Sequence, residues 1–154
     1  MAKYITPTLT ITSNKYTASS NPGPMSSPLS LSVTDLLDVT EVQSKIIDMT
    51  TDVHQIVWDA SDYTSSGVYG EDGGYLYFRN LLEENSPADK LHDIIIGIEN
   101  EDLDGDGEAD RLFTLQPGEF AWFPWDMTQD IYIDSLESNT GALEAILFVR
   151  TGTA

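Results

Sequence analysis

Apolar and polar residues alternate along much of the chain, and this period of two is typical of half-buried β-strands. Residues 28–34 alternate leucine and valine with serine and threonine, and residues 8–12 follow the same pattern. The segment 41–49 fits either a strand or a short helix. Short runs rich in β-branched and aromatic residues predict further strands, at 53–58, 74–79, 94–98, 111–115, 119–123, 130–134 and 145–149.

Turn-forming residues separate these runs. Glycine, proline, asparagine and aspartate gather at 70–74, 85–89, 116–119 and 139–141. Many short strands divided by such turns predict an all-β fold, an antiparallel β-sandwich or jelly roll with an extended N-terminal arm. Residues 59–73 carry few apolar side chains and are expected to form a long loop, a kind of segment that often binds ligands.

The composition changes near residue 30. The first 30 residues hold two of the seven basic residues and no acidic one, so they carry a charge of +2, whereas the remainder carries 26 acidic residues and a charge of −21. We expect residues 1–29 to form the arm and residues 30–154 the β-sandwich domain. The arm is either a flexible tail or a segment that orders on a neighbouring acidic subunit, for example by adding a strand to its sheet.

The net charge of −19 narrows the expected partners. Nucleic acid and anionic membranes require a concentrated basic surface, so neither is expected to bind. No run approaches the roughly 18 apolar residues of a membrane helix, and the first residues lack the apolar run of a secretory signal. The chain has no cysteine, which excludes disulfides and thiolate chemistry. These features predict synthesis in a reducing cytoplasm.

The most specific motif is Asp-x-Asp-x-Asp-Gly-x-x-Asp at residues 102–110. Carboxylates at this spacing converge on a hard cation, and Gly107 permits the sharp turn between them. The expected calcium ligands are four carboxylates and one backbone carbonyl: Asp102, Asp104, Asp106, Asp110 and the carbonyl of Glu108. Phe113 stands where a helix–loop–helix calcium site has a bidentate glutamate, so the expected affinity is modest and the role structural. The loop resembles calcium loops inserted in β-hairpins, such as those of integrin-type propeller blades; without an ion it would be a solvated acidic hairpin.

Catalytic motifs do not accompany this loop. His54 and His92 lie far apart in the sequence with no metal-binding spacing, and there is no nucleophile elbow, phosphate loop or zinc-protease motif. An acidic chain offers carboxylate pairs suited to glycoside hydrolysis by chance alone. We therefore expect a protein that is not an enzyme.

Residues 120–125 form the densest aromatic stretch. Alternation places Phe120 and Trp122 on one face of a strand and Phe123 on the other. Core packing is the expectation for such residues. If Trp125, which follows a proline, is exposed, it would serve as an oligomer contact or as a sugar-stacking platform.

Four phrases resemble small virion structural proteins of tailed bacteriophages: SLSVTDLLDV at 30–39, GYLYFRN at 74–80, LQPGEFAWFP at 115–124 and AILFV at 145–149. The resemblance implies a β-sandwich on the capsid or in the tail, often in a symmetric oligomer. The short length and the lack of coiled-coil heptads favour capsid decoration. The expected protein is a cement protein of the virion, made in the host cytoplasm. Its expected partners are the major capsid protein or other virion proteins and further copies of itself, for example in a trimer.

The alternative is a calcium-stabilised carbohydrate-binding module. It would bind glycans through residues 59–73 and exposed aromatic side chains. Saturable glycan binding by an isolated monomer would distinguish it from a virion component.

Overall fold

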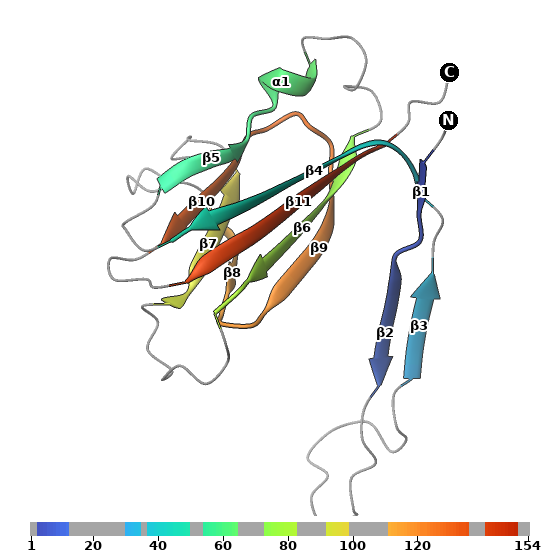
Figure 1. Ribbon diagram of the computed structural model, residues 1–154, viewed down its shortest axis with the longest axis horizontal. Coiled ribbons are helices and arrows are strands. Elements are labelled where there is room, and N and C mark those ends of the chain that lie inside the picture. The colour runs from blue at the N-terminus through green and yellow to red at the C-terminus, as the bar shows by residue number, and fades with distance from the viewer. Residues whose placement is uncertain are drawn as a thin grey trace, which may run out of the picture. The chain divides into compact units, whose positions relative to one another are not determined.

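The structure is a computed structural model that describes residues 3–12, 30–34, 37–49, 54–64, 73–82, 92–98, 111–135 and 141–150. Within these ranges the chain forms eleven strands and one helical turn (Figure 1). The elements are β1 (Lys3–Ile5), β2 (Thr8–Thr12), β3 (Ser30–Thr34), β4 (Leu37–Asp48), β5 (His54–Trp58), α1 (Ser61–Thr64), β6 (Gly74–Asn80), β7 (Ile94–Ile98), β8 (Arg111–Leu115), β9 (Phe120–Trp125), β10 (Ile131–Ser135) and β11 (Ala142–Arg150). In the described part of the chain no helix is long and apolar enough to cross a membrane.

The chain divides into two compact units, and the first comprises residues 1–39. In it β2 and β3 pair antiparallel as a separate two-stranded sheet. β1 pairs with the first residues of β4, Leu37–Val39. The alternating runs predicted at 8–12 and within 28–34 are therefore strands, and they pair with each other across the compositional boundary near residue 30. That boundary and the end of the compact unit fall at different places.

Within the described residues the β2–β3 sheet has two strands, and two-stranded sheets are marginally stable in water. Leu9 of β2 is 49% exposed, and Thr8 and Thr34 join the strands through a side-chain hydrogen bond of 3.3 Å. In the isolated chain we predict that β2 and β3 amides exchange with deuterium roughly 100-fold faster than β6 and β11 amides. Mass spectrometry of exchanged peptides measures this. Equal protection of the two pairs would contradict it and would mean that the β2–β3 sheet is covered in solution.

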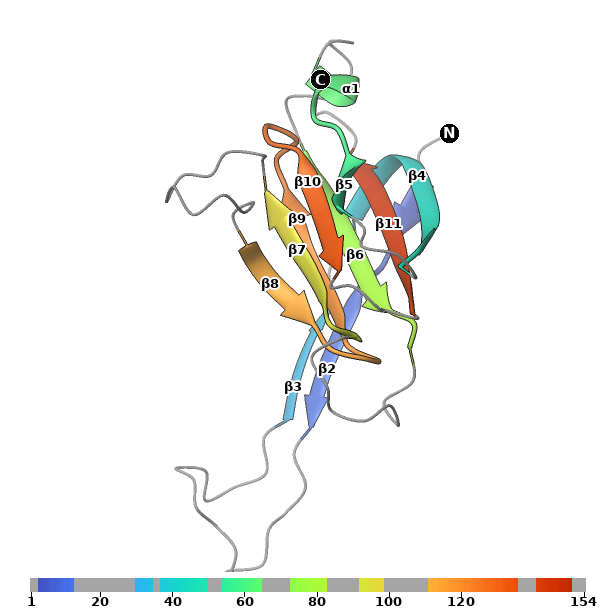
Figure 2. The same ribbon diagram turned by 90° about the vertical axis from the view of Figure 1, so that its left-hand side faces the viewer.

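The second unit, residues 40–154, contains the sandwich. One antiparallel sheet has the order β1-β4-β11-β6-β9, in which β4 runs from the first unit into the second, and the other has the order β5-β10-β7-β8 (Figures 1 and 2). The predicted all-β sandwich is confirmed. All seven strands predicted between residues 53 and 149 are present with small differences in their ends.

Alternate residues of both sheets fill one hydrophobic core. The inward side chains of β6 and β11 meet those of β7 and β10, and the following are fully buried: Leu76, Phe78, Ile94, Ile96, Ile131, Ile133, Leu143, Leu147 and Val149. Burial of each such side chain stabilises the fold by about 1.5–3 kcal/mol. The short apolar runs form strands because one side of each run is buried in this core.

The ambiguous segment 41–49 is a strand because β4 and β11 are hydrogen-bonded neighbours in the larger sheet. Beyond the end of β4, the amide of Met49 donates to the carbonyl of Gly141 at 3.0 Å, and near its start the hydroxyl of Thr40 donates to the carbonyl of Val149 at 3.4 Å. The predicted loop 59–73 begins with α1, and its residues 65–72 lie outside the described ranges.

Two glycines allow β6 to enter the sheet between its neighbours. Gly73 has φ of 64°, and a Cβ there would lie 2.5 Å from the carbonyl oxygen of Trp125. A Cβ on Gly74 would lie 2.6 Å from the carbonyl oxygen of Phe148. The turn predicted at 70–74 therefore needs glycine at both positions for steric reasons.

Asn80 holds the other end of β6 and is fully buried. Its amide nitrogen donates to the carbonyls of His92 at 2.9 Å and Leu115 at 3.2 Å. Its side-chain oxygen accepts from the amide of Leu82 at 3.1 Å. One side chain thus ties together three segments that are distant in sequence.

We predict that Asn80→Ala lowers the free energy of unfolding by about 2–4 kcal/mol, because two buried carbonyls lose their donor. Asn80→Asp should cost at least as much, since a carboxylate cannot donate to them. The exposed neighbour Arg79 provides the control, and Arg79→Ala should change stability by less than about 0.5 kcal/mol. Urea unfolding followed by tryptophan fluorescence measures all three. An Asn80→Ala value as small as the control value would contradict this role.

Candidate functional site

Five aromatic side chains lie on the solvent side of the larger sheet. Tyr75 and Tyr77 come from β6, Phe120 and Trp122 from β9, and Phe148 from β11. The strands are adjacent, and the residues between these positions on β6 and β11 point into the core. Phe120 is 62% exposed, and the other four side chains are half-buried. We call these five residues the aromatic face.

The rings of the aromatic face contact one another across the strands. Tyr75 stacks on Trp122 with centroids 5.3 Å apart and planes 15° apart, and Tyr77 stacks on Phe120 at 6.2 Å and 30°. Trp122 also meets Phe148 at 5.1 Å. Such offset pairs each contribute about 0.5–1.5 kcal/mol beyond their burial. The face is therefore held in one arrangement before any partner binds.

The surroundings of the aromatic face are apolar and nearly neutral. On β4, Val42 and Ile46 are 46% and 73% exposed on the same side of the sheet. The charged side chains beside the rings on β6 and β11 are Arg79, Glu144 and Arg150, in a chain whose net charge is −19. The outer side of an antiparallel sheet is usually polar. Exposed apolar patches are found at the interaction surfaces of many proteins, so this face is the candidate site.

The predicted alternation in the stretch 120–125 is confirmed by the register of β9 against β6. Trp122 lies opposite Tyr77, whereas Phe123 lies opposite the buried Leu76. Core packing holds for Phe123 and Trp125 but not for Phe120, which faces solvent.

Trp125 is 5% exposed, and its indole nitrogen donates to the carbonyl of Gln129 at 2.9 Å. Trp125 is therefore not an exposed oligomer contact or sugar-stacking platform, the roles that depended on its exposure. The signal that the sequence does carry for the aromatic face is GYLYFRN itself: Tyr75 and Tyr77 alternate with Leu76 and Phe78, so both sides of this strand are apolar.

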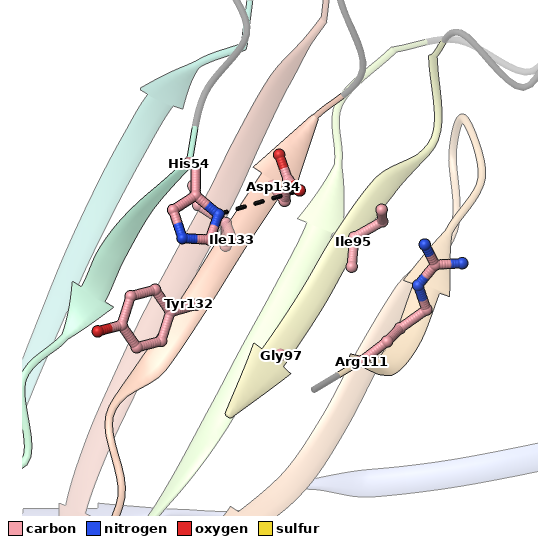
Figure 3. Close-up of a pocket in the computed structure, with 7 residues that line it drawn as sticks. All are labelled: His54, Ile95, Gly97, Arg111, Tyr132, Ile133 and Asp134. Carbon is pink, nitrogen blue, oxygen red and sulfur yellow. Dashed lines mark ion pairs between the residues drawn. The ribbon is translucent and has the colours of Figure 1, made fainter. Parts of the chain in front are cut away.

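A shallow pocket lies on the solvent side of the smaller sheet (Figure 3). His54 and Asp134 form an ion pair at 3.9 Å, and His54 stacks on Tyr132 at 5.6 Å. Gly97 lies between Tyr132 and Arg111 in the register and leaves the hollow. Two strand pairs around the pocket have an irregular register. Val57 is an extra residue where β5 pairs with β10, and Leu112 is an extra residue where β8 pairs with β7.

This pocket is small. Its volume is about 20 Å³, which is room for one water molecule. The side chains of His54 and Asp134 are 47% and 42% exposed, so their attraction is weak, about 0–1 kcal/mol. None of its lining residues is a serine, threonine, cysteine or lysine nucleophile.

Lys45 occupies an unusual environment under β4. Its ammonium donates to the carbonyl of Val57 and lies 4.0 Å from the ring centroid of Trp58. Burial lowers the pKa of Lys45, and the nearby Asp62 carboxylate opposes this shift. Burial also raises the pKa of Tyr63, whose hydroxyl donates to Gln43 at 3.0 Å. These contacts join β4 to β5 and α1, and their role is structural.

The predicted calcium ligands, Asp102, Asp104, Asp106, Glu108 and Asp110, all lie outside the described residues. The strands on either side of them are β7 and β8, which pair antiparallel as a hairpin. Strands rather than helices therefore flank the loop, as the sequence indicates. In the described ranges, no three histidine, aspartate or glutamate side chains gather closely enough to hold a metal ion.

We predict that the loop 102–110 binds calcium and stiffens the β7–β8 hairpin. Titration calorimetry of the full chain should give saturable heat at or below about millimolar calcium, the range of loops that lack a full ligand set. Asp104→Asn combined with Asp106→Asn should abolish that heat, because two charged ligands are lost. A flat trace for the parent chain, or an unchanged trace for the double variant, would contradict the prediction.

Comparison with known proteins finds no match to a family model, to a curated protein or to a solved structure.

Proposed function

We propose that the chain is a virion structural protein that decorates and stabilises a bacteriophage head through contacts with its own copies and with capsid proteins. The aromatic face is the observation that supports this most. It is an ordered, nearly neutral patch on a strongly acidic molecule, and aromatic residues are enriched in the contact surfaces of proteins.

The charge distribution suits such a role. The acidic residues keep particles dispersed through mutual repulsion. A neutral face is where another protein can approach without that repulsion. The N-terminal residues 1–30, which carry no acidic side chain, would add attraction to an acidic neighbour.

The chemistry of the aromatic face favours binding over catalysis. Its side chains are phenyl, phenol and indole groups, which pack and stack against other groups. The five side chains include no carboxylate and no imidazole. We therefore include no enzymatic activity in the proposed function.

The exposed rings also favour the alternative, a calcium-stabilised carbohydrate-binding module. Sugars stack on free ring faces. In the pairs Tyr75–Trp122 and Tyr77–Phe120, however, each ring covers part of its neighbour's face. Little free ring face is therefore left for a sugar to stack on. A protein does not need a free ring face, because it packs against the whole patch.

We predict that peptides of this chain are found by mass spectrometry in phage particles banded in caesium chloride from the source of the sequence. Antibody labelling in the electron microscope should then place the protein on the heads. Absence of the chain from banded particles, or labelling of tails alone, would contradict capsid decoration. Saturable glycan binding by the isolated chain, without particle association, would support the alternative.

A further inference from the structure

We infer that the occupant of the aromatic face is a second copy of this chain, packed face to face about a two-fold axis. This inference rests on the proposed function in one respect, that the face serves assembly, and it names the partner. The supporting observations are the layering of the sheet, its charges and its size.

The larger sheet is apolar on both sides. Leu76, Phe78 and Leu147 fill the core, while Tyr75, Tyr77 and Phe148 on the same strands face solvent. Strands with two apolar sides are those that other layers cover on both sides. Two such sheets pack about 10 Å apart with their side chains interleaved, so a copy of the same face provides a matching third layer.

The charge of the molecule restricts where a second copy can approach. Each copy carries a net charge of −19, and two such molecules repel strongly at most orientations. The outer side of β4, β6, β9 and β11 carries Arg79 and Arg150 against Asp38, Asp48 and Glu144, which gives a net charge of −1. Two copies therefore meet on this face with little of that repulsion.

The charges also favour one relative direction of the two copies. Asp48, Glu144 and Arg79 lie at one end of the face and carry a net charge of −1, because the bond from the Met49 amide to Gly141 places the end of β4 beside the start of β11 and Arg79 lies opposite Glu144 in the register. Arg150 lies at the other end, with its guanidinium 5.9 Å from the Tyr75 ring centroid. Glu144 and Arg150 are about 20 Å apart along β11. An antiparallel two-fold arrangement places Arg150 of each copy over Glu144 of the other.

The size of the face sets the strength of the contact. Four strands of about seven residues span about 19 Å by 23 Å, or about 440 Å² per copy. This is about half of the 800 Å² per partner in a stable standard interface. The pair is therefore expected to dissociate on dilution and to be reinforced on a particle, where copies are held close together.

Sedimentation of the full chain over a concentration series tests the inference. The mass should rise from that of one chain to that of two, and Phe120→Asp should raise the dissociation constant about tenfold or more, because it places a charge where the most exposed aromatic side chain of the face is to be buried. Ile56→Asp is the matched control, because Ile56 is a 41% exposed apolar residue of the smaller sheet. It should leave the dissociation constant unchanged.

A charge exchange tests the antiparallel arrangement. Arg150→Glu and Glu144→Arg should each weaken the pair, and the double variant should restore it, because the two charges then meet again with their signs reversed. A monomer at all concentrations, a trimer, an unaffected Phe120→Asp pair or a double variant weaker than both single ones would overturn the inference. These measurements use the purified chain alone. If they contradict the two-fold pair, the proposed function is still tested separately, by whether the chain associates with particles.

Discussion

The antiparallel pairing of β6 with β11 is the constraint on which the rest of the sandwich depends. It runs from Gly74 opposite Val149 to Asn80 opposite Leu143. Because side chains alternate between the two sides of a strand, a slip of one residue would move Leu76 and Phe78 to solvent and Tyr75 and Tyr77 into the core. The glycine entry at one end and the buried asparagine at the other oppose such a slip, since each fits only one position in the register.

The same register creates the aromatic face. Once Leu76 and Phe78 of β6 and the leucines of β11 fill the core, the alternate positions have to point outwards, and three of them are aromatic: Tyr75, Tyr77 and Phe148. The sheet is thus left with one covered and one uncovered apolar side, in a chain whose net charge is −19. Stability and function are linked here, because the pairing that stabilises the monomer also orders the surface that we propose for assembly.

Much of the fold follows from local sequence pattern. The period of two and the turn residues locate the strands to within a few residues, because strand formation in such segments reflects alternation and β-branched content. The partners of each strand do not follow from local pattern. Segment 41–49 becomes a strand because β4 pairs with β11, and residues 8–12 pair with residues 30–34.

The candidate site shows the same division. The sequence indicates that Phe120 and Trp122 share a face of the strand. It does not indicate that this face is the solvent side, because both sides of β6 and β9 are apolar. The side that the second sheet covers becomes the core. The role of Asn80 depends on His92 and Leu115, which lie 12 and 35 residues away, so no nearby residue signals it. The calcium loop is the reverse case: its motif is explicit in the sequence, and its residues lie outside the described structure.

The central claim is that the aromatic face becomes covered when the protein assembles, and tryptophan fluorescence tests it directly. Of the three tryptophans, Trp58 and Trp125 are buried at 1% and 5% exposure, and Trp122 is the one that solvent reaches. Acrylamide quenching of the full chain therefore reports mainly on Trp122. Quenching that falls as the protein concentration rises through association is the predicted result. Quenching that stays constant while the mass increases would show that the copies meet elsewhere, and would contradict the account.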